Sequence, residues 1–518
     1  MVNHTPNDSF PTPTSQLQLE TEEVLAKHVP LEDTTVKPCL QRNNHLRFLL
    51  RNLTQGFPIR YVAQDASQPW LMYWILQAFS IMQVGMDPNN KRRAIDRMLA
   101  CQHPDGGFGG GPKHEAHLLP TYAAVCALAI AGSPGENGGW DQIDREKMYE
   151  FFMSLKQPDG SFTVSRRGEV DVRGIYCLLA VATLLNIVTP ELVEGTPAFI
   201  ASCQTYEGGF ACASFPFFTS EPGTPTTLLS SPRPPLGEAH GGYTFCAVAS
   251  WLLLQPFNSS QSYPASINTR NLLRWLVQMQ GSDIELGGFR GRTNKLVDGC
   301  YAWWVGGCFS LLEGLDGGES QALETHESVH DEKAEDGDDW VDEDTDSDPW
   351  NTDALQEYVL YAGQHPAGGL RDKPPKSADS YHTLYCLAGL SAAQHKIIPD
   401  TGHRKALEAL WQPNPGTSLN LEGAKEKKVL DDDLRREFYT RALSWNEDSR
   451  KKRIVVGGNE NRLVRVDFLL ALGLASYALF PQNPTHPLFN LTATHTDGIM
   501  SYFYGQPVPP SRARPDKK

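Results

Sequence analysis

The sequence predicts an all-α protein made of helical hairpins that are stacked side by side or closed in a ring. A unit of glycine turn, polar loop and apolar helix recurs along the chain, with a period of about fifty residues where no insertion lengthens it. The turns DGGF, DGSF, EGGF, LGGF and AGGL mark five copies, which end at Phe108, Phe162, Phe210, Phe289 and Leu370. Apolar helices such as TYAAVCALAIAG and VRGIYCLLAVATLL follow the turns.

The repeat domain is expected to span residues 45–505. The segment 1–44 before it is rich in Pro, Thr and Ser, which predicts a disordered or extended segment with a short helix near Leu17–His28. Pro69–Val84 (PWLMYWILQAFSIMQV) predicts a buried helix that opens on proline. Its Trp70 and Trp74 share a face, because residues four apart are neighbours on a helix.

Three insertions lengthen the repeats, at about 216–236, 315–350 and 422–453. The net charge of −15 belongs almost entirely to the second, where 316–348 hold fifteen acidic side chains against one lysine. The folded surface is therefore close to neutral, which argues against a nucleic-acid partner. We expect the last apolar helix at Leu463–Phe480 and an extended tail at 506–518.

Composition favours a cytoplasmic protein without stable membrane insertion. The best apolar run, Ile175–Val188, is too short to span a bilayer and contains Asn186. The N-terminus has no basic-then-apolar signal pattern, and the C-terminus has no lipidation motif. Ten cysteines without a CxxC pair suit reduced thiols.

The repeat also predicts where a site should lie. Each helix that follows a turn carries a tyrosine near its start, so a ring would gather these starts at one mouth. Helix starts favour anions. The tyrosines are Tyr122, Tyr176, Tyr243, Tyr301 and Tyr381.

A metal pair is one interpretation of Asp298 and Cys300, in the stretch GGFRGRTNKLVDGCYAWWVGG. At a helix start, with Gly299 to loosen the backbone, the two side chains can converge. The alternative is an N-capping aspartate beside a buried cysteine. His382 stands at the equivalent start of the next inner helix, and three O, S and N ligands would leave an open position, as catalytic zinc sites do.

An anion clamp and an apolar pocket would complete such a site. Arg292 and Lys295 precede Asp298, while His240 and Arg173 hold similar places in earlier repeats. Surface charge is the alternative interpretation for these residues, and core packing is the alternative for the apolar set. The apolar candidates are Trp70, Tyr176, Tyr243, Cys246, Trp304 and Tyr385. A zinc ion, an anion clamp and a deep apolar pocket together suit a reaction between a lipid diphosphate and a thiol. The zinc would bind that thiol and lower its pKa, so that it is present as thiolate.

The motifs NKLVDGCY, EAHGGYTFC, DVRGIYC, PWLMYW and DSYHTLYCLAGLS closely resemble those of protein farnesyltransferase beta subunits, in the protein prenyltransferase family. The resemblance covers about residues 45–505. It implies an α/α toroid of six inner and six outer helices that pairs with an alpha subunit. The implied reaction transfers farnesyl from farnesyl diphosphate to the cysteine of C-terminal CaaX sequences.

The resemblance also implies roles for single residues. The zinc ligands would be Asp298, Cys300 and His382. The diphosphate contacts would be His240, Arg292, Lys295 and Tyr301. Arg173, Tyr176, Tyr243, Cys246 and Trp304 would line the farnesyl chain, with Arg173 also near the peptide carboxylate. Trp70, Trp74 and Tyr381 would meet the CaaX side chains. Asp372 would hold magnesium on the diphosphate. The catalytic set would be Asp298, Cys300, His382, Lys295 and Tyr301.

Relatives that transfer geranylgeranyl are the nearest alternative. Bulky Trp70 and Tyr385 at the implied pocket floor favour farnesyl, as does Asp372, where the resemblance gives lysine to the magnesium-independent geranylgeranyl enzyme. A terpene cyclase would need an acidic motif inside the cavity, and the only candidate, Asp431–Asp433, lies in a charged segment. A scaffold that binds partners through the acidic run would need no Asp/Cys/His set.

Overall fold

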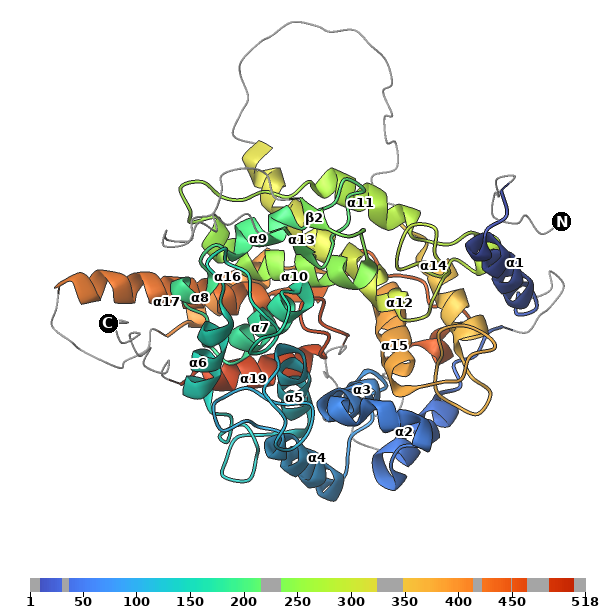
Figure 1. Cartoon of the computed structure of the whole chain (residues 1–518), viewed down its shortest axis with the longest axis horizontal. Coiled ribbons are helices and arrows are strands. Elements are labelled where there is room, and N and C mark those ends of the chain that lie inside the picture. The colour runs from blue at the N-terminus through green and yellow to red at the C-terminus, as the bar shows by residue number, and fades with distance from the viewer. Residues whose placement is uncertain are drawn as a thin grey trace, which may run out of the picture.

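Six inner helices form a closed ring in the computed structural model (Figure 1). The structure describes residues 10–29, 37–215, 234–323, 348–412, 422–448, 450–463 and 484–506. Each inner helix packs on the next, and the last packs back on the first, as α15 contacts α3. In ring order they are α3 (Gln68–Ile81), α5 (Leu118–Ala131), α7 (Val172–Leu184), α10 (Gly241–Asn258), α12 with α13 (Tyr301–Trp304 and Gly306–Leu323) and α15 (Ser380–Gln394).

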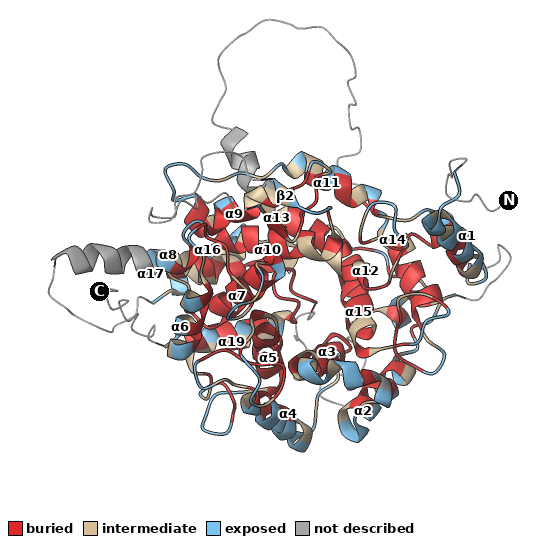
Figure 2. Ribbon diagram, viewed as in Figure 1, coloured by how far each residue is buried: buried red, intermediate tan, exposed pale blue. Residues whose placement is uncertain are grey.

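An outer helix precedes each inner helix and completes a hairpin. The outer helices are α2 (Arg42–Gln55), α4 (Pro88–Ala100), α6 (Arg145–Leu155), the short α8 and α9 (Pro190–Val193 and Thr196–Ser202), α11 (Thr269–Gln278) and α14 (Thr352–Glu357), which continues into the π-turn η3 (Tyr358–Gly363). Inner and outer helices differ in burial as the sequence predicts. All of α5 except Leu119 is buried, whereas α4 buries only Ala94, Ile95 and Met98 on one face (Figure 2).

Each glycine turn connects the outer helix to the inner helix of its own hairpin and packs against the next hairpin. The aromatic or leucine that ends each turn is fully buried and pairs back to the end of its outer helix, as Phe108 does with Gln102. A Cβ on Gly106 would lie 2.0 Å from the carbonyl oxygen of Lys147 in α6, the next outer helix. Gly368 packs in the same way against Asn44 in α2, at 2.2 Å. The turn of the last hairpin thus packs on the first.

A turn in the last part of the chain closes the base of the ring. The hydroxyls of three inner-helix tyrosines donate to three consecutive carbonyls of the turn that precedes α19 (Ala493–Tyr504). The pairs are Tyr73 with Asn490 at 2.7 Å, Tyr122 with Phe489 at 2.7 Å and Tyr176 with Leu488 at 3.0 Å. The predicted helix at Leu463–Phe480 lies outside the described residues apart from its first residue.

The insertions contain more packed structure than the sequence suggested. The ends of the first are paired, β1 (Ala213–Ser214) with β2 (Pro235–Leu236). In the segment 422–453, expected to be exposed, α17 (Glu422–Leu443) buries Phe438 and Ala442, so its second half belongs to the core. The acidic run and the tail lie mostly outside the described residues. Smaller elements are α16 (Thr401–Leu410), the strand pair β3 (Ile397–Pro399) and β4 (Trp445–Glu447), and the short helices η1 (Ile59–Ser67), η2 (Asp283–Glu285) and η4 (Asn459–Asn461).

The N-terminal segment carries a docked helix, α1 (Pro13–Ala26), where a mostly disordered segment was expected. Leu25 is fully buried, and the amide of Gln18 donates to the buried carboxylate of Glu285 at 2.8 Å. The observed helix is therefore longer than the one predicted near Leu17–His28 and begins earlier. No helix in the described part of the chain is long and apolar enough to cross a membrane.

Candidate metal centre and anion site

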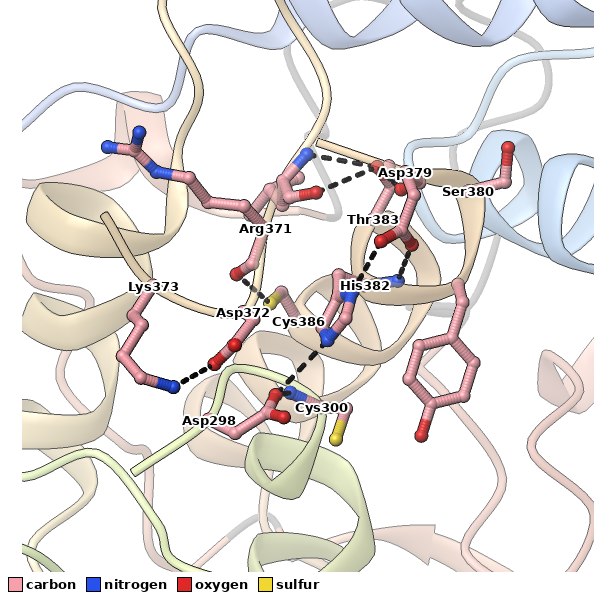
Figure 3. Close-up of polar contacts among 12 residues, drawn as sticks. Asp298, Cys300, Arg371, Asp372, Lys373, Asp379, Ser380, His382, Thr383 and Cys386 are labelled. Carbon is pink, nitrogen blue, oxygen red and sulfur yellow. Dashed lines mark hydrogen bonds and ion pairs between the residues drawn. The ribbon is translucent and has the colours of Figure 1, made fainter. Parts of the chain in front are cut away.

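Asp298, Cys300 and His382 lie together at the mouth of the ring (Figure 3). Their potential ligand atoms are all within 4.8 Å of one another, and Nε2 of His382 is 3.2 Å from Oδ1 of Asp298. Asp298 and Cys300 precede α12, while His382 is in the first turn of α15, which packs on α12. The ring therefore brings the predicted ligands of adjacent repeats side by side.

Gly299 makes this arrangement possible by its small size. A Cβ at this position would lie 2.6 Å from the carbonyl oxygen of Arg371 and 2.6 Å from Sγ of Cys386. Its backbone is not in the left-handed region, so the structure shows a need for a small residue here and not for a left-handed backbone. Asp298 also accepts a hydrogen bond from the N–H of Cys300 at 2.9 Å. Its carboxylate therefore binds the backbone at the helix start and also lies close to the thiol of Cys300, so the two interpretations of this pair are compatible.

Asp379, which the sequence analysis did not single out, orients the histidine. It is the N-cap of α15, where its carboxylate accepts the backbone N–H of His382 and contacts Nδ1 of the ring, both at 2.7 Å. We place the Nδ1 proton in the bond to the carboxylate, which leaves Nε2 facing Asp298. A carboxylate behind a ligating histidine is a common feature of metal sites. The N-cap signal of an aspartate three residues before the histidine could have identified it.

The charges around His382 favour a cation at this place. Burial alone would lower the pKa of His382, but hydrogen bonds to Asp298 and Asp379 raise it to about 12. Burial alone would raise the pKa of Asp298, but the bond to His382 outweighs it and the pKa is lowered. Burial and the charge of Asp298 raise the pKa of the Cys300 thiol. Without metal, the positive charge between the carboxylates is thus an imidazolium, and a metal ion would replace it.

His240 and Tyr301 form a neutral hydrogen-bonding pair next to this group. His240 caps α10, and its Nδ1 accepts the N–H of Gly242 at 3.0 Å. The proton therefore lies on Nε2, which is 3.2 Å from the hydroxyl of Tyr301. Burial and the charges of Arg292 and Arg173 lower the pKa of His240 to about 4. His240 is therefore a neutral hydrogen-bond donor at neutral pH, whereas the sequence alone left its charge open.

Arg292 and Lys295 lie on the loop before α12, and Arg173 lies in the first turn of α7. Arg292 forms an ion pair with Glu238, two residues before His240. Lys295 is exposed, and no ion pair is formed by its ammonium group within the described residues. Arg173 binds the capping carboxylate of Asp171 at 2.6 Å and lies over the ring of Tyr243 at 5.1 Å. Arg292 and Arg173 are already paired with carboxylates, which the sequence did not predict.

Asp372 lies beside the metal candidates. Its carboxylate is paired with the ammonium of Lys373 at 2.6 Å, and its carbonyl accepts the N–H of Gly299 at 2.8 Å. Burial and the charge of Asp298 raise the pKa of Asp372. The resemblance implied a magnesium role for Asp372 but neither its position beside Asp298 nor its pairing with Lys373.

A continuous aromatic wall extends from the metal candidates to α3. The ring of Tyr381 is 5.0 Å from the ring of His382. Trp304 donates its indole N–H to the hydroxyl of Tyr381 at 3.0 Å. The remaining ring pairs are Tyr381–Tyr385 at 4.8 Å, Trp304–Tyr385 at 4.5 Å, Tyr381–Trp74 at 5.4 Å and Trp74–Trp70 at 5.9 Å.

The other predicted lining residues lie on α7 and α10. Tyr176 and Cys246 are buried, and the hydroxyl of Tyr176 is bonded to the turn at the base. Tyr243 is half-buried, with its ring 4.7 Å from the ring of His240. Tyr243 thus lies at the anion end, whereas Tyr176 lies in the interior.

The chain is similar to known proteins over most of its length. Residues 40–470 match the model of the "Prenyltransferase alpha-alpha toroid domain". Protein farnesyltransferase subunit beta of Pisum sativum is 38% identical over 367 residues, which cover 64% of this chain and 80% of that relative. The Arabidopsis thaliana protein of the same name is 38% identical over 397 residues, covering 70% and 74%. Geranylgeranyl transferase type-2 subunit beta of Saccharomyces cerevisiae is 25% identical over 359 residues, covering 68% and 89%.

Both the ring of helical hairpins and these similarities agree with the resemblance seen in the sequence motifs. The family model matches well over half of the chain, and the farnesyltransferase relatives are covered over more than two thirds of their length. The chain therefore belongs to the family of protein farnesyltransferase beta subunits, among the prenyltransferases with an alpha-alpha toroid.

Proposed function

We propose that this chain is the catalytic subunit of a protein farnesyltransferase, which transfers farnesyl from farnesyl diphosphate to the cysteine of C-terminal CaaX sequences. One observation carries the proposal: a three-residue O, S and N group lies between an anion-binding end and an aromatic wall. The O, S and N group would bind a metal and a thiol, the anion-binding end would bind a diphosphate, and the aromatic wall would contact a prenyl chain. The identity of 38% to farnesyltransferase beta subunits, against 25% to the geranylgeranyl relative, supports farnesyl as the lipid.

Zinc is the metal that suits Asp298, Cys300 and His382. Thiolate, imidazole and carboxylate are its usual ligands, and three of them leave one position for a substrate thiol. Zinc bound there would lower the pKa of that thiol, so that thiolate exists at neutral pH. Asp379 would keep His382 in place with Nε2 toward the metal.

Residues at the anion end would stabilise the diphosphate as it leaves. The Tyr301 hydroxyl oxygen accepts a hydrogen bond from Nε2–H of His240, so its own O–H can donate to a phosphate oxygen. Arg292 and Lys295 would add positive charge to the developing anion. Asp372, once released from Lys373, would be available to magnesium on the same group.

The aromatic wall would hold the prenyl chain and the CaaX side chains. We assign the farnesyl chain to Tyr176, Tyr243, Cys246 and Trp304, with Arg173 also near the peptide carboxylate. Trp70, Trp74 and Tyr381 would meet the peptide, and Trp70 with Tyr385 would limit the length of the lipid. Apart from Arg173, whose side chain is 45% exposed, each of these side chains is buried or half-buried.

We infer that the chain acts in a heterodimer with an alpha subunit, in a reducing compartment such as the cytoplasm. The partner follows from family membership. All ten cysteines are unpaired, as expected where thiols stay reduced. We propose a toroid domain at 45–505, with 1–44 and 506–518 as flanking segments.

The decisive assay uses the full chain co-expressed with an alpha subunit. Labelled farnesyl diphosphate and geranylgeranyl diphosphate are offered in parallel to a CaaX peptide, with a peptide whose cysteine is serine as control. We expect farnesyl transfer to the cysteine peptide only. Absence of transfer, or faster geranylgeranyl transfer, would refute the proposal.

A further inference from the structure

Two carboxylates of one repeat hold the loop that carries the proposed diphosphate cations. The loop lies between Arg290 and Val297, which are bridged to each other. Arg292 forms an ion pair with Glu238. The hydroxyl of Thr293 donates to Glu207 at 2.7 Å. The loop before α12 is thus held by two carboxylates from the segment that precedes α10, in the previous repeat.

The two carboxylates differ in what they bind. Glu207 contacts neutral donors, the Thr293 hydroxyl and the backbone N–H of Ala239 at 3.2 Å. Glu238 binds the guanidinium of Arg292. The side chains of Arg292 and Glu238 are 39% and 51% exposed, so an incoming anion can reach the pair from solvent. Glu238 also lies close enough to His240 for its charge to act on that ring.

A diphosphate and the carboxylate of Glu238 would compete for the same guanidinium. Arginine binds carboxylate and phosphate through the same planar donors. An exposed ion pair is weak, so a multiply charged anion can displace the carboxylate. Once displaced, the negative charge of Glu238 remains beside the bound anion and repels it.

We propose that Glu238 is a competing ligand for Arg292, which occupies the guanidinium in the free protein, yields it to the substrate diphosphate and promotes release of the diphosphate product. Glu238 is therefore an affinity-determining residue and not a catalytic one. The inference rests on the proposed function, in which Arg292 contacts the diphosphate.

The test compares Glu238→Gln with Glu207→Gln in the full chain co-expressed with an alpha subunit. Inorganic diphosphate is the probe, and its inhibition constant is measured against farnesyl diphosphate with magnesium chelated. We expect Glu238→Gln to bind inorganic diphosphate about fivefold more tightly, the scale of one exposed charge interaction. The gain should shrink as salt is raised. Glu207→Gln, which removes no competitor for a cation, should not tighten binding.

The result for Glu238→Gln decides the inference, because equal or weaker binding of inorganic diphosphate overturns it. Glu238→Ala gives a second measurement if the glutamine variant does not fold, as judged by thermal unfolding. In the presence of magnesium, loss of the competitor should also tighten farnesyl diphosphate binding, measured under single-turnover conditions. Slower release of the diphosphate product should lower kcat in the steady state.

Arg292→Gln separates the failure of this inference from the failure of the proposed function. We expect Arg292→Gln to weaken inorganic diphosphate binding, and Glu238→Gln to have no further effect in that background. If Arg292→Gln binds the probe as the unaltered protein does, Arg292 is not a diphosphate contact, and both the inference and that part of the proposed function are overturned. If only the tightening by Glu238→Gln is missing, the competing role alone is overturned.

Discussion

At the scale of single residues, the metal candidates depend on a side chain that is not itself a ligand. Asp379 caps α15 and holds Nδ1 of His382, so one carboxylate fixes both the helix start and the ring. Figure 3 shows this carboxylate on the far side of His382 from Asp298. The position of Nε2 therefore depends on Asp379.

We expect Asp379→Asn to reduce zinc affinity by about tenfold or more, the usual effect of losing such a carboxylate. Asparagine can still cap the helix, so the fold should be retained. The measurement is zinc content after dialysis against graded concentrations of chelator. Asp171→Asn is the matched control, because Asp171 caps α7 in the same way without a histidine behind it. Equal zinc retention in both variants would contradict the role of Asp379.

A buried histidine at the base predicts a loss of stability in acid. His486 donates from Nε2 to the Ala442 carbonyl at 2.7 Å and accepts at Nδ1 from the N–H of Leu488 at 3.2 Å, so it is neutral. Burial lowers its pKa to about 4. The unfolded chain binds this proton below about pH 6.5 and the folded chain does not. Its contribution to stability is therefore complete above about pH 6.5 and is lost progressively as the pH falls toward about 4.

The size of this effect is about 1.4 kcal/mol for each pH unit in that window. Thermal unfolding midpoints of the unaltered protein and of His486→Gln, recorded from pH 7 to pH 5, measure it. We expect a shallower pH dependence in the variant. Parallel curves for the two proteins would show that another group causes the acid sensitivity.

At the scale of elements, the aromatic wall is shared among three inner helices. Trp70 and Trp74 come from α3, Trp304 from α12, and Tyr381 from α15. The ring of Trp70 also lies 5.7 Å from that of Tyr122 in α5. A change in Trp70 therefore alters the space between α3 and α5 and leaves the metal candidates in place.

We expect Trp70→Thr to admit a longer prenyl chain. The smaller side chain should raise the ratio of geranylgeranyl to farnesyl transfer by about tenfold, because removal of the partly buried indole leaves space that a further isoprene unit can fill. Competition between the two labelled diphosphates gives the ratio directly. Unchanged zinc content serves as the control for an intact site. If the variant keeps the original preference for farnesyl, Trp70 does not form the pocket floor.

The sequence predicted those elements whose signal lies within a short stretch of the chain. The glycine turns and apolar helices are periodic, and the period placed Asp298 and His382 at equivalent helix starts. The neutral state of His240 could not be predicted, because it depends on burial and on Arg292 and Arg173 from other repeats. The pairing of Arg292 with Glu238 joins residues 54 positions apart and has no local signal. The same holds for Phe438 in α17, which is buried although its sequence surroundings are charged.

At the scale of the whole molecule, a close backbone contact between the first and last hairpins adds to the packing of α15 on α3 that closes the ring. Gly368 has a positive φ of 91° and packs against the backbone of Asn44. His45, next to Asn44, is fully buried, with Nε2 2.8 Å from the side-chain oxygen of Gln364. The contact between α2 and the last turn thus combines close backbone packing with a buried polar bond.

We expect Gly368→Ala to lower the thermal unfolding midpoint by several degrees more than Gly135→Ala. Both glycines have a positive φ, so each alanine carries a similar backbone cost of about 1 kcal/mol. Only Gly368 would place its Cβ against another segment, since nothing lies within 4 Å of a Cβ at Gly135. Equal shifts in the two variants would mean that the junction can widen at no cost.

The hydrogen bonds of the three tyrosines have a consequence for the order in which the chain can fold. An open array of repeats can nucleate anywhere and grow by local contacts. Here Tyr73, Tyr122 and Tyr176 bond to residues that lie 417, 367 and 312 positions later. Contacts so distant in sequence slow folding, because the entropy of closing the loops is lost before the contacts form. During synthesis the early hairpins must wait for the turn at Leu488–Asn490, and their apolar inner faces would need protection until nearly the whole chain has been made.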